Sequence, residues 1–490
     1  MSLKNFVFQR LLESGADVEE FYQKYWQGFE TGFWEAEISV GRLSYPRSSV
    51  FLNHWLVAQT GEEVVAREVF DRFKRFADHD AGLSMQDLLR QIHSAASTYR
   101  AFIEGAAKEG GAIDRLGLLG YRTGVLESEV IKPLVLALLS NKHLSIPAPQ
   151  LVKALEVIES WMVRRMLVRA TAKGYNQFIA EMIGQLRNWE PAAVGDEIEA
   201  FLAKQTADSR YWPDDAELGE ELTDLLAYRR LRRGRLRMLL ESIEDHLRGW
   251  RDGKQGLGGE RVARGKLAIE HVMPRKWQQH WPAKSSTEED VRDGLIHTLG
   301  NLTLLTAKLN SKVSNGPWSG LNSKKAGLEE HDVLILNRDL LKSAGGEWTE
   351  EAIRGRTQEL VRFVSEIWAV PLEHRSGSTV VRRPARRVDL LDLISAGLLH
   401  AGMPLIPKRK KFSHRVATLL ADGRVEVDGK AFENAGQAAT EIYGKKAGGW
   451  WFFLIDPTSG RTLRTIRREY IEAMVGDSDD DDQDDDDDEV

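Results

Sequence analysis

The chain has 490 residues, 42% of them hydrophobic and 29% charged, a composition typical of soluble globular proteins. At about 100–200 residues per domain, this length predicts two to four domains. The chain contains no cysteine, which excludes disulfide scaffolds, thiolate zinc sites and cysteine nucleophiles. Any metal must therefore be held by His, Asp, Glu or Asn, ligands that favour Mg²⁺ or Mn²⁺. No apolar run approaches the roughly 20 residues that cross a bilayer, so we expect a cytoplasmic protein without membrane contact.

The net charge of -7 is concentrated at the C-terminus, where eleven acidic side chains lie between Asp477 and Glu489. Without them the rest of the chain is mildly basic. Like charges in one block repel each other and cannot be buried, so we expect residues 476–490 to be a disordered acidic tail. The tail could serve solubility, or it could mimic phosphate and compete with nucleic acid for basic surface.

The first half of the chain has helical periodicity, because apolar residues recur every three or four positions from Asn5 to Trp250. Proline-containing segments at 45–46 and 146–149 predict helix boundaries, and a further helix is expected over residues 149–166. We therefore expect a helical domain over residues 1–145 and a helical linker domain over residues 146–250. The aromatic residues expected in the first core are Trp26, Phe29, Phe33, Trp34 and Trp55.

A strongly basic segment closes this helical half. Residues 228–238 carry six arginines and are predicted to form one helix. Its arginines could form a solvated helix face or a wall that positions phosphates without reading bases. In the second interpretation Arg235 is expected to contact a phosphate of the DNA.

A motif that could carry chemistry lies in residues 251–370. A short strand over residues 266–270 is expected to end in Glu270 and His271, and a second strand is expected directly after Asn301, followed by a helix that bears Asn310. Phosphodiester hydrolysis needs a base that activates water and a cation that stabilises the charge on the phosphate. An acid–His pair ending a strand, a second strand and an Asn-bearing helix can provide these groups.

The segments EHVMP, from residue 270, and HTLGNLTLLTAKLNSKVSN, from residue 297, resemble the HNH (His-Me finger) nuclease superfamily. More closely, they resemble the C-terminal nuclease domain of GmrSD-type, modification-dependent (type IV) restriction endonucleases. Val272 is a mild departure from the isoleucine usual in the family. The resemblance implies the following roles: His271 as general base; Glu270 and Asn310 as ligands of Mg²⁺ (or Mn²⁺); Asn301 as the residue that orders the loop presenting His271; and Lys312, Asn315 and Lys324 as phosphate or support contacts.

Two other histidines compete with His271 in this region. His280 lies in WQQHW, where packing or a substrate contact is expected, and His297 is expected to be structural. A single histidine after a strand is more often structural than catalytic. The order and spacing of the whole motif, rather than any one residue, therefore support nuclease chemistry.

Three helical segments extend the resemblance to the same family, at residues 3–12, 121–139 and 161–177. In full-length members a ParB-like nucleotide-hydrolysing module with a DGQQR-type motif precedes them, and this chain has no such motif. The chain therefore resembles either the distal part of a split enzyme or a truncated one, and we expect a separately encoded ParB-like NTPase subunit as partner. We expect it to dock on the N-terminal helical region, which is rich in Trp and Phe.

A linker is expected over residues 371–387, followed by a small α+β domain over residues 388–475. The expected order is helix, several strands, helix, an aromatic strand (WWFFLID) and a final helix. This region resembles the RAMA module, a family thought to sense modified DNA. Four consecutive basic residues could hold phosphates, and one of four consecutive aromatic residues could stack on an exposed base. In an alternating strand at most two of the four aromatics face outward, and all four could instead serve packing. The residues assigned to DNA contact are Lys408, Arg409, Lys410, Lys411 and Trp450.

Together these observations predict a mainly α chain with α+β parts, in which a ββα-metal finger is embedded in helices. The resemblance implies an Mg²⁺-dependent DNA endonuclease subunit of a phage-defence system that cuts modified DNA. Two alternatives stay open. One is a non-catalytic scaffold that binds modified DNA, and the other is an RNase toxin built on the same finger.

Overall fold

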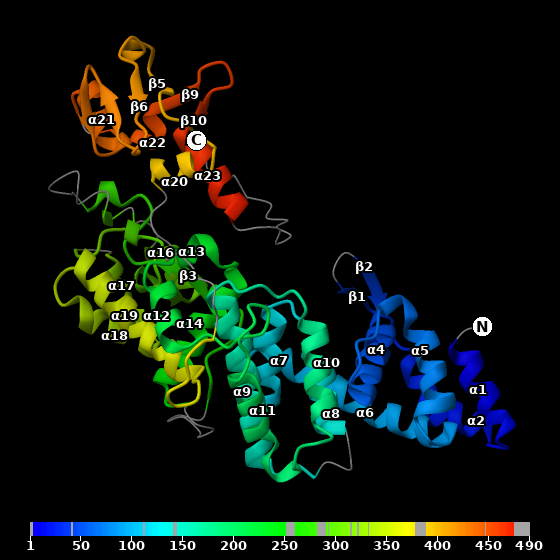
Figure 1. Ribbon diagram of the computed structural model, residues 1–490. Helices are drawn as coiled ribbons and strands as arrows, with labels where there is room; N and C mark the ends of the chain where they lie inside the picture. Colours follow the sequence, from blue (N-terminus) through cyan, green and yellow to red (C-terminus); the bar gives the residue numbers. More distant parts are fainter. Residues whose placement is uncertain are drawn as a thin grey trace. The chain divides into compact units, whose positions relative to one another are not determined.

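The computed structural model describes residues 3–40, 43–110, 113–140, 145–250, 260–281, 291–292, 294–313, 316–320, 323–331, 333–377, 389–445 and 447–474, and every structural statement below concerns these residues. The chain forms two compact units, Met1–Pro384 and Ala385–Val490. Both are drawn in Figure 1. Helices dominate and the sheets are small, which confirms the predicted mainly α fold with α+β parts.

The first unit begins with helices and one antiparallel hairpin. The helices are α1 (Leu3–Glu13), α2 (Val18–Phe21), α3 (Gly32–Glu35), α4 (Arg47–Thr60), α5 (Val69–Arg75), α6 (Met85–Ala106), α7 (Arg115–Val125) and α8 (Lys132–Ser140), and the hairpin pairs β1 (Glu37–Val40) with β2 (Leu43–Pro46). The next helices are α9 (Ala148–Leu167), α10 (Tyr175–Gln185), α11 (Val194–Ala203), α12 (Asp215–Thr223), α13 (Ala227–Arg230) and α14 (Arg233–Leu247). The predicted helix over residues 149–166 is α9, with proline in its first turn.

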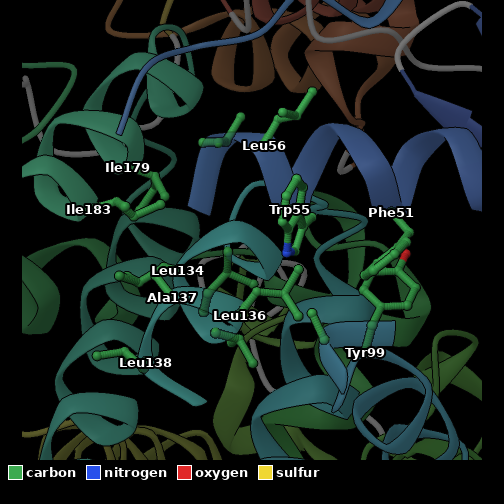
Figure 2. Close-up of a cluster of buried hydrophobic side chains, with 14 of the residues drawn as sticks. Phe51, Trp55, Leu56, Tyr99, Leu134, Leu136, Ala137, Leu138, Ile179 and Ile183 are labelled. Atoms are coloured by element: carbon green, nitrogen blue, oxygen red, sulfur yellow. The ribbon is translucent and has the colours of Figure 1, made fainter. Parts of the chain in front are cut away.

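Side chains from α4, α6, α8 and α10 meet in the first hydrophobic core (Figure 2). Trp55 of α4 and Tyr99 of α6 are buried there, and Leu134 and Leu138 come from α8. The five aromatic residues expected in the core are either buried in it or packed against it. Because Trp34 and Trp55 are buried, the docking surface predicted for a partner cannot be formed by these two side chains.

The basic segment over residues 228–238 does not form one helix, which corrects the prediction. Helix α13 ends at Arg230, Leu231 and Arg232 are extended, and α14 begins at Arg233. Leu231 is buried in the second hydrophobic core. The six arginines therefore lie on two helices and the link between them, rather than on one continuous basic helix.

Helix α14 holds the remaining part of the first unit through buried carboxylates and one arginine. Arg237 Nε donates to the Leu267 carbonyl (2.8 Å). Asp245 accepts from the Val262 amide (2.7 Å), and Glu244 accepts from the Leu336 amide (2.8 Å). Each carboxylate satisfies a main-chain donor that burial would otherwise leave without a partner. Helix α14 thus fixes the chain on both sides of the predicted motif.

The motif segment contains β3 (Ala268–His271), β4 (Leu302–Leu305) and the helices α16 (Ala307–Val313), α17 (Lys324–His331), α18 (Ile335–Ala344) and α19 (Glu350–Ile367). After α19, residues expected in the linker pack on the first unit. His374 Nε2 lies 2.8 Å from the Trp212 carbonyl oxygen, and the Ser376 amide donates to Asp214 (2.9 Å). The part of the linker over residues 371–377 therefore belongs to the first unit.

The second unit is an antiparallel sheet with helices. Its elements are α20 (Leu390–Ser395), β5 (Pro404–Pro407), β6 (Ala417–Leu419), β7 (Val425–Val427), β8 (Lys430–Phe432), α21 (Ala435–Tyr443), α22 (Gly449–Phe452), β9 (Phe453–Asp456), β10 (Arg461–Thr462) and α23 (Leu463–Met474). The strand order is β10-β9-β5-β6-β7-β8, and these strands are drawn in orange and red in Figure 1. The predicted order of elements is confirmed, and the predicted hairpin joins β6 to β7.

The aromatic strand expected over WWFFLID is only partly a strand, which is a second correction. Residues Gly449–Phe452 form a helical turn, and the strand begins at Phe453. A Cβ atom on Gly449 would overlap the carbonyl of Ala435, so this turn packs directly on the start of α21. The acidic tail predicted at residues 476–490 lies outside the described residues. Among the described helices, none has the length and apolarity that crossing a membrane requires.

Candidate functional site

The predicted strand–strand–helix arrangement is present. Strands β3 and β4 pair antiparallel, with Glu270 opposite Thr303 and His271 opposite Leu302. Helix α16 follows β4 after one residue and packs against both strands. The end of β3, where Glu270 and His271 lie, and the helix that carries Asn310 are therefore neighbours.

Asn301 ties the loop after β3 to the start of β4. Its side chain is completely buried (0% exposed). Its Oδ1 accepts from the Met273 amide (2.8 Å) and from Trp348 Nε1 (3.0 Å), and its Nδ2 donates to the carbonyls of Met273 and Ile296 (2.9 Å each). All four hydrogen bonds serve the fold, so the side chain has no capacity left for a substrate. This geometry is that of a residue that orders the loop, the role expected from the resemblance.

Gly300, which precedes Asn301, lies directly against α19. A Cβ atom at this position would overlap the Ile353 carbonyl oxygen and the Thr357 hydroxyl. Arg356 Nη1 donates to the carbonyls of Gly300 (2.7 Å) and Leu302 (2.8 Å). The glycine is therefore required because two backbones approach closely, and α19 holds the turn from behind.

His271 is buried (6% exposed) and contacts two rings. Its Nε2 lies 3.2 Å from His297 Nδ1. The ring centroid of Tyr228 lies 4.2 Å from that of His271 and 5.8 Å from that of His297. The Tyr228 amide donates to the His297 carbonyl (3.1 Å), so α13 holds both histidines. The sequence predicts a structural role for His297, and its position four residues before Asn301 was the signal for a place beside the site.

Burial, with smaller contributions from His297, Arg275 and Lys324, lowers the pKa of His271 to about 2. Burial also lowers the pKa of His297 to about 3, with Arg229 and Arg275 adding to the effect. Both imidazoles are therefore neutral at physiological pH. In a neutral imidazole one nitrogen donates and the other accepts. If the nitrogen of His271 that faces His297 donates, its other nitrogen is left as an acceptor.

Glu270 is paired with a buried lysine. Lys324 Nζ, from the start of α17, forms an ion pair with Glu270 Oε1 and donates to the His271 carbonyl (2.5 Å). Burial lowers the pKa of Lys324, and Glu270 opposes this effect. Lys324 was expected to contact phosphate or to support the site, and its burial favours support.

Asn310 supplies an acceptor without a partner. Its Oδ1 is buried and no described group donates to it. Mg²⁺ prefers oxygen ligands and keeps several waters, so a carboxylate and an amide oxygen on neighbouring elements fit it. The described residues contain no group of three or more His, Asp or Glu that could hold a metal. An ion at this site would therefore depend on Glu270, Asn310 and water. Asn315 and the side chain of Lys312 lie outside the described residues.

The arginines before the site are largely engaged with the protein itself. Arg235 Nη2 donates to the Leu126 carbonyl (3.4 Å) and lies 3.8 Å from Glu127. Arg232 also pairs with Glu127, and Arg233 lies over the Tyr228 ring, 3.5 Å from its centroid. Phosphate contact by Arg235 stays a prediction and would compete with its contact to Glu127.

In the second unit the four basic residues predicted to contact DNA are on the surface. Arg409 donates to the Tyr443 hydroxyl (2.7 Å), and Lys410 and Lys411 lie in an exposed turn. Trp450 is partly buried against the core, with the Arg467 guanidinium 4.8 Å from its ring centroid. Trp451, which the sequence did not distinguish from its neighbours, is instead the exposed aromatic.

Comparison with known families finds two matches. Residues 212–363 match the model of the C-terminal domain of GmrSD restriction endonucleases. Residues 373–475 match the RAMA model, whose full description is Restriction Enzyme Adenine Methylase Associated. Among curated proteins, none gave a significant match to the chain. The first match contains the whole strand–strand–helix site, and the second contains all described residues of the second unit.

Proposed function

We propose that this protein is an Mg²⁺-dependent endonuclease subunit that cuts foreign modified DNA in a phage-defence system, because residues 212–363 match the C-terminal domain of GmrSD restriction endonucleases and residues 373–475 match the RAMA family. One observation carries the proposal. A buried, neutral imidazole, His271, ends a strand beside Glu270, next to the helix in which Asn310 has an unfilled acceptor. This is the set of groups that a His-Me finger nuclease requires.

In the proposed mechanism His271 is the general base. In this mechanism Nε2 of His271 carries the ring hydrogen and donates it to Nδ1 of His297, 3.2 Å away, which leaves Nδ1 of His271 to accept the proton from the attacking water. Proton transfer by a positioned group accelerates a reaction by about 10²- to 10⁴-fold. Asn301 acts as a positioning residue, because it fixes the main chain two residues beyond His271.

Glu270 and Asn310 are the residues that would hold Mg²⁺ or Mn²⁺. Such an ion, when bound, supplies positive charge that stabilises the phosphate and the departing 3′ oxygen. Lys324 pairs with Oε1 of Glu270, which leaves Oε2 for a further ligand. The buried ammonium of Lys324 also keeps this carboxylate in place while DNA enters.

A separately encoded ParB-like NTPase subunit would complete the enzyme, and the second unit would contribute to selecting modified DNA. The system would act in the cytoplasm, where phage DNA enters. These assignments follow from the resemblance of the chain to the GmrSD and RAMA families.

The test is the nicking of phage DNA in the presence of Mg²⁺ by the chain together with its partner. His271→Ala should lower the cleavage rate by about 10²- to 10⁴-fold. His280→Ala, which changes an exposed histidine, should not change it. Equal cleavage by the His271 variant would refute the assignment. Binding without cleavage under any metal or nucleotide would indicate a scaffold, and preferential cleavage of RNA would indicate an RNase.

A further inference from the structure

One exposed tryptophan in the second unit lies close to two cations. Trp451 is 55% exposed. The Arg464 guanidinium carbon lies 3.8 Å from its ring centroid, and Lys408 Nζ lies 5.9 Å from it. We call Trp451, Lys408 and Arg464 the stacking patch. Its three residues come from α22, from the end of β5 and from α23, so the fold brings together segments that are distant in sequence.

The position of Trp451 is fixed by the fold. Gly449 packs on the carbonyl of Ala435, where no side chain would fit, and Phe453 is fully buried directly after the turn. The Lys408 amide donates to the Phe452 carbonyl (2.8 Å), which joins the end of β5 to the helical turn. Because both ends of the turn are held, the exposed indole is a feature of the folded domain and not of a loose loop.

The surroundings of the patch are basic. Arg409, Lys410 and Lys411 follow Lys408 directly, and among the described residues none of these four side chains forms an ion pair with a carboxylate. Other exposed apolar side chains of this unit, such as Leu398 and Val416, lie elsewhere in the sequence, after α20 and directly before β6. A single flat ring among cations does not provide the apolar area that a lipid surface or a protein hot spot would need. It does match a nucleic-acid base and its flanking phosphates, because bases stack on aromatic rings and cations contact the backbone.

We propose that Trp451 stacks on an unpaired or extrahelical base of DNA while Lys408 and Arg464 contact the neighbouring phosphates. The inference rests on the proposed function only in taking DNA as the substrate. It assigns the contact to Trp451 and not to Trp450, whose ring packs against the core. It also gives the second unit a preference for bases outside the double helix.

The experiment measures equilibrium binding of the full chain to fluorescently labelled DNA by anisotropy. Two duplexes of equal length are used, one fully paired and one with a single extrahelical base. Trp451→Ala should weaken binding of the second duplex by about 5- to 150-fold and should hardly change binding of the first. Trp451→Phe keeps a ring and should retain most of the selectivity. Val416→Ala, an exposed site elsewhere in the same unit, is the matched control and should change nothing.

Each outcome bears on the proposal. Equal losses on both duplexes, or no loss on either, would overturn stacking by Trp451. A loss with Trp451→Phe as large as that with Trp451→Ala would do the same. Lys408→Ala should weaken both duplexes alike, which provides a second variant if Trp451→Ala proves unstable. If the wild-type chain binds neither duplex but the complete enzyme cleaves DNA, the stacking patch is refuted and the proposed function survives.

Discussion

The two units offer their functional side chains in opposite ways. In the strand–strand–helix site, His271, Asn301 and Lys324 are buried and bonded to groups of the chain itself. In the second unit, Trp451 and the run from Lys408 to Lys411 are on the surface. In the first arrangement the positions of the side chains are set by the fold before a substrate binds. A substitution there is therefore expected to change both activity and stability. The second leaves stability independent of binding. Substitutions in the first unit should therefore lower stability and cleavage together, whereas substitutions at the surface of the second should change DNA binding alone.

The largest effect is expected at Gly300. Gly300→Ala places a Cβ into the Ile353 carbonyl oxygen, which should lower the free energy of unfolding of the first unit by about 3 kcal/mol or more and abolish cleavage. Calorimetry of the full chain would show this as a lower melting temperature. Gly448→Ala is the control, since nothing lies within 4 Å of its Cβ position. An unchanged transition in Gly300→Ala would contradict the close approach of the two backbones.

Asn301→Ala should have the next largest effect. It removes four hydrogen bonds and leaves the buried Met273 amide and Trp348 Nε1 without acceptors, which should cost about 2 to 3 kcal/mol of unfolding free energy. Cleavage should fall as well, because the loop after His271 loses its support. Asn434→Ala in the second unit removes the N-cap of α21. It should cost about 1 kcal/mol and leave cleavage by the folded enzyme intact. Full activity in Asn301→Ala would show that the loop is ordered by other contacts.

Acid should destabilise the first unit through its buried histidines. The folded-state pKa values of His271 and His297, about 2 and about 3, lie below the ordinary value of 6.5, so the unfolded chain binds more protons. Stability is therefore complete above pH 6.5 and is lost as the pH falls below it, by up to about 1.4 kcal/mol per pH unit for each ring. Chemical denaturation at pH 7 and pH 5.5 measures the slope. His271→Asn should reduce it, and an unchanged slope would mean that the rings are already protonated in the folded protein.

The smallest effect is expected for the exposed lysines. Lys410→Ala and Lys411→Ala should each reduce the slope of log affinity for DNA against log salt by about 0.9, with no change in melting temperature. Lys430→Ala, an exposed lysine on β8, provides the comparison. Binding titrations between about 50 and 200 mM salt would measure it. A loss of thermal stability in the Lys410 or Lys411 variant would contradict the claim that these surface side chains do not contribute to the stability of the second unit.

Much of the site was predictable because its parts are local in sequence. An acid–His pair at a strand end and a strand followed by an Asn-bearing helix can be recognised from spacing, and β3, β4 and α16 lie where the spacing places them. The pairings of His271 with His297 and of Glu270 with Lys324 were not predictable. They join residues 26 and 54 positions apart. The resemblance marked Lys324 as a phosphate or support contact, but nothing in a single sequence identified Glu270 as its partner or His297 as the partner of His271.

Two predicted elements, the strand over WWFFLID and the helix over residues 228–238, were wrong for a similar reason. The alternation rule for WWFFLID failed because Gly449 packs on Ala435, and the first three residues of the segment form a helical turn with this glycine. The single basic helix expected over residues 228–238 failed because Leu231 is buried in the core, which interrupts the helix between α13 and α14. In both places tertiary packing overrides a local pattern.

The salt bridge between Lys324 and Glu270 has a consequence for how the protein can be handled. Metal-dependent folds such as classical zinc fingers unfold when a chelator removes their ion. Here an ammonium group from the chain pairs with the carboxylate at the end of β3, so we expect this strand end to fold without an inorganic ion. A preparation kept in EDTA should therefore melt as the untreated protein does, and adding back a divalent salt should restore turnover without any refolding step.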